Sequence, residues 1–257
     1  MTRATVPAEQ AVANTRASLA RGFPRFAPDG SQKRGPMIIV GGGPSVALHT
    51  PTIRRLAEAG IPVMALKGAW RHLEQSRIPV AACLLMDPHP CQTGYLPDWP
   101  LPIKWIVASQ CDPAVFDKLQ GHDVAVWYGP ELPHMRRGAG LGSRAIRVAQ
   151  ADGYGPLPLF GMDGSFKLGA PTHIYDLKND GSEPFDVLWG GRFFVSTEPL
   201  VQEVETIVDM YVKRDGPEIK VYGGGLLGHA LTWARRSYPD LPDPVGHDPG
   251  DLAQDVA

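Results

Sequence analysis

The fold of this chain is indicated by ten residues at positions 37–46, which read MIIVGGGPSV. The first four are all apolar, as in a strand of a parallel sheet that is buried on both faces. Three glycines, a proline and a serine follow. Residues 46–59 then place apolar side chains at helical spacing as far as Gly60, a residue type that favours the end of a helix. The stretch therefore predicts a strand, a tight turn and a helix.

The same alternation of short apolar runs and helical patterns continues along the chain. Further strands are expected at residues 61–66, 80–86, 103–108, 124–128, 157–160 and 219–222. Helices are expected at residues 69–75, 114–119, 141–151, 198–212 and 226–235. Apolar strands separated by helices are typical of parallel sheets with right-handed crossovers. The sequence thus predicts an α/β fold, with a Rossmann-like, mostly parallel sheet flanked by helices.

Three segments depart from this alternation. Residues 1–35 combine a short helical pattern with a polar stretch and are expected to form a loosely packed N-terminal arm. Within the Rossmann-like domain at residues 36–237, the segment 165–196 is polar and then aromatic, so an irregular loop and a hairpin insertion are expected there. The tail at residues 238–257 is rich in proline and aspartate and is expected to be disordered.

The composition excludes several classes of protein. With 257 residues, of which 43% are hydrophobic and 20% charged, the chain has the profile of a globular protein. Its formal net charge of -2 provides no basic surface for nucleic acid. Its apolar runs are far shorter than the roughly 20 residues that span a membrane, and the absence of a secretory signal predicts a cytoplasmic location. The three cysteines lack paired spacing, which indicates neither disulfides nor a zinc site.

The glycine-rich turn is the clearest candidate for a binding site. Gly41, Gly42 and Gly43 allow the backbone to approach a phosphate closely, and the following helix presents unpaired N–H groups at its positive end. Ser45, after Pro44, adds a hydroxyl donor. The pattern is neither GxGxxG nor a P-loop, which needs a lysine. We expect the turn to bind a phosphorylated small molecule such as a nucleotide. The alternative is a tight turn in which glycine serves backbone geometry alone.

Two aspartates follow predicted strands, at the edge where α/β proteins place their ligands. Asp87 comes directly after the strand at 80–86, and Asp163 comes shortly after the strand at 157–160. These catalytic candidates could hold a divalent metal such as Mg²⁺, bind ribose hydroxyls or act as a base. Gly161, at the end of the second of these strands, is placed in the same binding site. The alternative for each aspartate is a helix cap or a turn residue.

A histidine lies in the polar loop that follows Asp163. Because an imidazole titrates near neutral pH, His173 is a candidate general base, and a surface histidine is the alternative. The loop at residues 165–179 starts at the ligand edge of the sheet, which predicts a segment that orders over a bound donor. Arg144 and Arg147, in the helix at 141–151, are expected on a solvated helix face, and the alternative is that they reach a phosphate.

Taken together, five segments resemble the MptE-like family, which contains archaeal 6-hydroxymethylpterin diphosphokinases, bacterial motility accessory factors that are proposed flagellin glycosyltransferases, and many uncharacterised phage proteins. The segments are IIVGGGPS at 38–45, LLMDPHP at 84–90, ASQCDPAVFDKL at 108–119, GLGSRAIRVAQADGYGPLPLFGMDGSF at 140–166 and VYGGGLLGHAL at 221–231. As a set they are fairly specific, and they extend over most of the chain. The resemblance implies a Rossmann-like transferase.

Two motifs differ from those of the proteins they resemble. The opening GGGPS is similar to the GNGPS turn of bacterial sialyltransferases, which lies against a cytidine-activated sugar, but Gly42 stands where that turn has asparagine. The pterin diphosphokinases have an acidic metal-binding run similar to TDLDG after the third strand. Here the chain has MDPHP and retains one carboxylate, Asp87.

The resemblance implies a transferase that binds a nucleotide-activated donor at residues 41–45. The expected type is a motility-accessory-factor glycosyltransferase, with Asp87 and Asp163 holding the donor or a metal ion and with an unidentified acceptor. One alternative is a diphosphokinase-like enzyme that uses ATP and magnesium. Another is a non-catalytic nucleotide-binding module, because a fold alone does not fix function.

Overall fold

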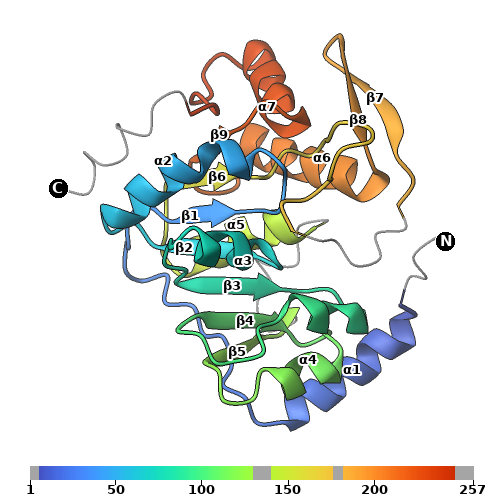
Figure 1. Cartoon of the computed structure of the whole chain (residues 1–257). Coiled ribbons are helices and arrows are strands. Elements are labelled where there is room, and N and C mark those ends of the chain that lie inside the picture. Colours follow the sequence, from blue (N-terminus) through green and yellow to red (C-terminus); the bar gives the residue numbers. More distant parts are fainter. Residues whose placement is uncertain (1–5, 130–139, 176–181, 247–257) are drawn as a thin grey trace.

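The computed structural model describes residues 6–129, 140–175 and 182–246. Seven parallel strands form one sheet in the order β5-β4-β3-β2-β1-β6-β9 (Figure 1). They are β1 (Ile38–Val40), β2 (Val63–Leu66), β3 (Ala82–Leu85), β4 (Lys104–Ala108), β5 (Val124–Trp127), β6 (Leu157–Phe160) and β9 (Ile219–Tyr222). The Rossmann-like α/β fold expected from the sequence is confirmed, with strand ends that differ by one or two residues.

Helices cover both faces of the sheet. They are α2 (Val46–Glu58), α3 (Ala69–Gln75), α4 (Pro113–Lys118), α5 (Leu141–Ala151), α6 (Glu198–Val212) and α7 (Leu226–Ser237), with a 3-10 helix η1 (Pro90–Tyr95). In Figure 1, α2 and α3 lie on the nearer face, while α5 packs against β2 and β3 from behind. The longest of these helices, α6, has 15 residues, and no helix in the described ranges is long and apolar enough to cross a bilayer.

The central strands are buried on both faces. Every residue of β1, β2, β3, β5 and β6 is buried. Strand β1 lies in the middle of the sheet, where Ile39 pairs with Met64 of β2 on one side and with Leu159 of β6 on the other. This double coverage explains why the strands read as uninterrupted apolar runs in the sequence.

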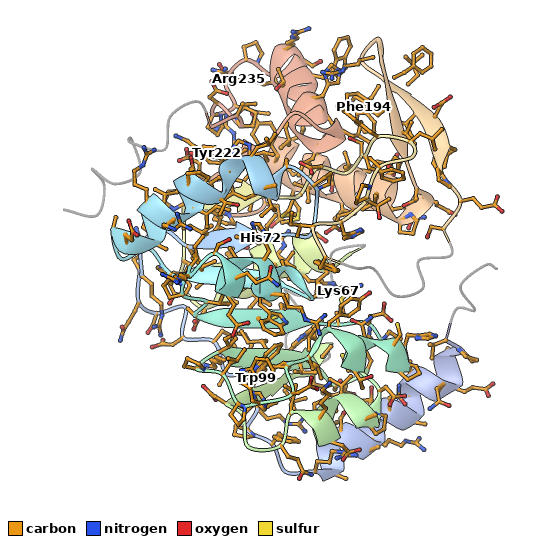
Figure 2. The ribbon with its side chains drawn as sticks, viewed as in Figure 1. Lys67, His72, Trp99, Phe194, Tyr222 and Arg235 are labelled. Carbon is orange, nitrogen blue, oxygen red and sulfur yellow. The ribbon has the colours of Figure 1, made fainter. Side chains whose placement is uncertain are left out.

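The expected insertion contains an antiparallel hairpin. Its strands β7 (Phe185–Trp189) and β8 (Arg192–Ser196) form a separate two-stranded sheet. Gly190 and Gly191 join them with φ angles of 53° and 82°, and two-residue hairpin turns with positive φ at both positions match the twist of the strands. Phe194 is buried between the hairpin and α7, as Figure 2 shows. The hairpin insertion is therefore confirmed.

The N-terminal arm packs against the sheet edge. Helix α1 (Ala8–Ala20) contacts α4, and the side chains of Asn14 and Ser18 are buried. Further along, the N–H of Phe26 donates to the carbonyl of Val126 at 2.9 Å, and the Phe26 ring is buried. The expected loose packing is wrong for the described residues 6–35, because this segment packs on the edge strand β5 and adds Phe26 to the core.

Part of the C-terminal segment is also folded. Leu241 is buried, and the N–H of Val221 in β9 donates to the carbonyl of Pro244 at 2.7 Å. Tyr211 Oη donates to the carbonyl of Pro242 at 2.6 Å. The expected disorder is therefore wrong for residues 238–246. Residues 247–257 lie outside the described part of the chain.

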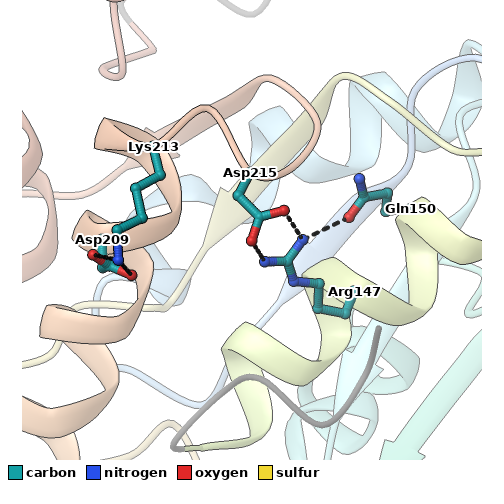
Figure 3. Close-up of polar contacts among 5 residues, drawn as sticks. All are labelled: Arg147, Gln150, Asp209, Lys213 and Asp215. Atoms are coloured by element: carbon teal, nitrogen blue, oxygen red, sulfur yellow. Dashed lines mark hydrogen bonds and ion pairs between the residues drawn. The ribbon is translucent and has the colours of Figure 1, made fainter. Parts of the chain in front are cut away.

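The Arg147 side chain is buried and forms an ion pair, which corrects the expected solvated helix face. Its side chain is 5% exposed, and Nη2 lies 2.6 Å from Oδ2 of Asp215 after α6 (Figure 3). Nη1 donates to Oδ1 of Asp215 at 3.2 Å and to Gln150 at 3.1 Å. The pair joins α5 to the end of α6. Figure 3 also shows an exposed pair, Lys213 with Asp209.

These two ion pairs provide a matched test of how burial of the cation affects the contribution of an ion pair to stability. Arg147→Met should lower the free energy of unfolding by about 2 kcal/mol, because it removes the buried guanidinium that donates to both carboxylate oxygens of Asp215. That value lies below the cost for fully buried pairs because the Asp215 side chain is 42% exposed. The control Lys213→Met should change stability by about 0.5 kcal/mol or less. Urea unfolding measures both, and equal losses would contradict the assignment.

Candidate functional site

The strand order reverses direction between β1 and β6, and this reversal creates the site. Successive strands from β1 run toward β5, whereas β6 and β9 lie on the other side of β1. Ligands of open α/β sheets bind in the crevice at the carboxyl ends of the strands at such a switch point. Here the N–H of Gly43, after β1, donates to the carbonyl of Gly161, after β6, at 2.7 Å.

A cavity of about 400 Å³ opens at this edge of the sheet. Most of the residues predicted from the sequence line it: Gly41, Gly42, Gly43, Asp87, Gly161, Asp163 and His173. Pro44 and Ser45 are not part of the lining. The structure thus brings together residues that are up to 132 positions apart in the chain (41 to 173), and it places the predicted turn and loop on one wall.

The N–H groups of the glycine-rich turn are largely bonded within the protein. Gly41 donates to the carbonyl of Phe160 at 2.8 Å, and Gly43 donates to Gly161. The N–H of Ser45 donates to Oδ2 of Asp163 at 3.0 Å. These groups are therefore not free to receive a phosphate in this conformation.

The glycines are required by close contacts inside the protein. A Cβ at Gly42 would lie 2.6 Å from Cε1 of Tyr175 and 2.7 Å from Cδ2 of His173. A Cβ at Gly43 would overlap the Asp163 carboxylate. Any larger residue here disturbs packing whether or not a ligand binds, which supports a geometric role for the glycines.

Asp163 connects the glycine-rich turn at residues 41–45 with a second glycine-rich turn at residues 223–225. Its carboxylate accepts the N–H of Ser45 at the start of α2, and its own carbonyl accepts the N–H of Leu227 at the start of α7 at 3.1 Å. Gly225 approaches its backbone so closely that a side chain there would overlap it. Burial raises the pKa of Asp163, while hydrogen bonds from Ser45 lower it. The geometry is that of a buried cap, with the residue 8% exposed.

A half-buried carboxylate, which the sequence analysis did not single out, caps α5. Glu203 of α6 accepts the N–H of Gly140 at 2.7 Å and the N–H of Ser143 at 2.5 Å, and Ser143 Oγ donates to it at 2.8 Å. Burial raises the pKa of Glu203, and the hydrogen bonds from Ser143 and Gly140 lower it. In the sequence, the signal was an acidic residue beside the apolar stripe of an amphipathic helix.

Asp87 pairs with a lysine that the sequence analysis also missed. Lys67 follows β2 directly, has a φ of 50°, and places Nζ 3.5 Å from Oδ2 of Asp87. Oδ1 of Asp87 accepts the N–H of His89 at 2.9 Å. Figure 2 shows Lys67 at the carboxyl edge of the sheet. Among the described lining residues it is the only lysine or arginine.

The described residues do not assemble a metal site by themselves. They contain no group of three or more His, Cys, Asp or Glu side chains arranged to hold an ion. Asp163 is engaged with Ser45, and an ammonium group lies beside Asp87. Because Mg²⁺ is usually held by one or two carboxylates together with substrate phosphates, the ligand would have to supply most of the coordination.

His173 lies beside the glycine-rich turn. The N–H of Ile174 donates to the carbonyl of Gly42 at 2.7 Å, which holds the loop against the turn. His173 Nδ1 lies 3.1 Å from Thr172 Oγ1, and its ring centre is 5.2 Å from that of Tyr175. The ring lines the same cavity as Gly43 and Asp163, which is the position a general base needs. Residues 176–179 of the predicted loop lie outside the described residues.

The chain is similar in fold to a MAf glycosyltransferase. The solved structure is that of the MAf glycosyltransferase from Magnetospirillum magneticum AMB-1, with a TM-score of 0.62 and 18% sequence identity. The similarity covers 87% of this chain and 38% of that one, so this chain spans well under half the length of its structural neighbour. No family model and no curated protein matches the chain. At this level of identity the likeness shows a shared fold.

The Glu203 cap predicts a pH-dependent stability. Because its folded-state pKa is raised above the ordinary value near 4.5, its contribution is fully present below that pH. The contribution is lost as pH rises through the folded-state pKa. The unfolding free energy of wild type should therefore fall more steeply with rising pH above 4.5 than that of Glu203→Gln. Glu205→Gln, an exposed change on the same helix, is the control, and parallel curves for wild type and Glu203→Gln would refute the prediction.

Proposed function

We propose that this protein is a glycosyltransferase-type enzyme that binds a nucleotide-activated donor in the cavity between β1 and β6. The observation that supports it best is the convergence of Lys67, Asp87 and His173 on a ligand-sized cavity at the topological switch point. The shared fold with a MAf glycosyltransferase and the resemblance of the opening motif to a donor-binding turn point to the same chemistry.

In this proposal the charged and titratable residues of the cavity have distinct tasks. His173 removes the proton from the acceptor hydroxyl as its oxygen bonds to the anomeric carbon of the sugar. The bond between that carbon and the phosphate oxygen breaks, and its electron pair leaves with the nucleotide. Lys67 compensates the charge of the departing phosphate, while Asp87 orients the lysine through their ion pair.

The electrostatics of the cavity favour Lys67 as the phosphate contact. The N-termini of α2 and α5 face the cavity, but each already binds a carboxylate, Asp163 and Glu203 respectively. An incoming phosphate would have to displace those acceptors to reach the backbone N–H groups. The Lys67 ammonium lies 3.5 Å from Asp87 and carries three N–H donors, so an ion pair with Asp87 is compatible with a contact to a phosphate.

A nucleotide panel tests the binding claim. CMP, CDP, UDP, GDP and ATP are each added with and without Mg²⁺, and one of them should raise the melting temperature by about 5 to 10 °C at a concentration near 100 times its Kd. Lys67→Met should weaken that binding, whereas Lys104→Met, at the opposite edge of the sheet, should not. Stabilisation by ATP only with Mg²⁺ would favour the diphosphokinase alternative. No shift across the panel would refute nucleotide binding.

The base assignment makes a kinetic prediction. His173→Ala should lower the rate of donor cleavage by about 100-fold to 10,000-fold while leaving donor affinity nearly unchanged, because a general base acts in the transition state. Release of the free nucleotide measures the rate, and calorimetry measures the affinity. His72→Ala, which removes a ring bonded to Thr50 between α3 and α2, serves as the control. Equal turnover in the His173 variant and wild type would exclude the base role.

A further inference from the structure

One buried polar atom in the cavity wall has no hydrogen-bond partner among the residues that the structure describes. Gln92, in η1, is 1% exposed and lines the cavity. Its Oε1 is buried and accepts no hydrogen bond from the described residues, while its Nε2 donates to Cys91 Sγ at 3.8 Å. Buried amide groups in native proteins are nearly always hydrogen-bonded, so this atom requires an explanation.

The location of Gln92 distinguishes it from other buried polar atoms without partners. In the described part of the chain such atoms also occur in Ser45, Trp105, His122, Trp127, Arg144 and Arg147. None of those residues lines the cavity, whereas Gln92 does. The unsatisfied acceptor therefore coincides with the candidate ligand site.

The backbone around Gln92 is held in place from several sides. Trp70 Nε1 donates to the carbonyl of Tyr95 at 2.7 Å, and Arg71 Nη2 donates to the carbonyl of Gly94 at 2.6 Å. The N–H of Gln92 itself donates to the carbonyl of His89 at 3.1 Å. These hydrogen bonds hold the backbone of η1 in place. A small shift of the backbone that would give Gln92 Oε1 a donor is therefore disfavoured.

We propose that Gln92 is a specificity-determining residue whose side-chain amide binds a hydroxyl group of the ligand. A hydroxyl fits because it donates to Oε1 and can also accept from an amide N–H. Lys67 lines the same cavity and provides the complementary contact for an anionic group. The ligand class is thus a hydroxylated sugar next to a phosphate, and this inference rests on the proposed function.

Because Gln92 Oε1 has no hydrogen-bond donor among the described residues, we expect its replacement to affect protein stability and ligand binding differently. Replacing it with an apolar side chain of similar size removes a buried polar group that has no partner, which leaves the empty protein equally or more stable. The same change leaves the ligand hydroxyl unpaired and weakens binding. A purely structural glutamine would behave in the opposite way, since its removal would lower stability.

The test compares Gln92→Met with Gln110→Met. Gln110 lines the same cavity, but its Nε2 donates to the carbonyl of Met86 at 2.9 Å. The melting temperature of Gln92→Met should equal or exceed that of wild type, whereas that of Gln110→Met should fall. A lower melting temperature for Gln92→Met would overturn the proposal, whichever nucleotide binds.

Calorimetry then measures the affinity of CMP, UDP, GDP and ATP, each beside its 2′,3′-dideoxy analogue. Gln92→Met should bind the best of these nucleotides about tenfold more weakly than wild type. If wild type binds the dideoxy analogue about as weakly as Gln92→Met binds the full nucleotide, the contact is with the ribose. A loss confined to the matching nucleotide-sugar assigns it to the transferred sugar. Unchanged affinity for the nucleotide, for its dideoxy analogue and for the matching nucleotide-sugar would overturn the proposal. Absence of binding to wild type would refute the proposed function and leave the melting temperatures to decide on Gln92.

Discussion

Asp163 lies between the two halves of the sheet and accepts hydrogen bonds from both. Through Oδ2 it accepts the N–H of Ser45, which starts the helix after β1, and through its backbone carbonyl it accepts the N–H of Leu227, which starts the helix after β9. Gly43 and Gly225 lack side chains at the points of closest approach. One buried acidic residue therefore joins the two walls of the crevice at the switch point.

This constraint determines how a ligand can be bound. Helix N-termini commonly bind anions, but at this cavity α2 and α5 are capped by Asp163 and Glu203. The protein thereby stabilises its own helices and leaves Lys67 as the cation of the described cavity wall. Polar contacts to a ligand would come from side chains on the loops after β2 and β3 and from His173. In the proposed function, the glycine-rich turn shapes the wall and those side chains supply the chemistry.

The parts of this structure that depend on local sequence could be predicted, whereas the parts that depend on distant partners could not. Uninterrupted apolar runs such as residues 37–40 indicated a parallel sheet because both faces of β1 are covered. Asp163 was recognised as a residue of the ligand edge, but its role as a cap depends on Ser45, 118 positions away. The same holds for Glu203, whose partners lie 60 or more positions earlier. A buried atom without a hydrogen-bond partner, such as Gln92 Oε1, cannot be identified without a three-dimensional structure.

The most direct test of this account is the unfolding free energy of two Asp163 variants. Asp163→Ala should lose about 1 to 3 kcal/mol, because the Ser45 N–H is left unsatisfied in a half-buried position. Asp163→Asn should recover at least half of that loss, since its amide oxygen can accept the same N–H. Urea denaturation of both variants beside wild type decides the matter. An alanine variant within about 0.5 kcal/mol of wild type would contradict a structural role for this carboxylate.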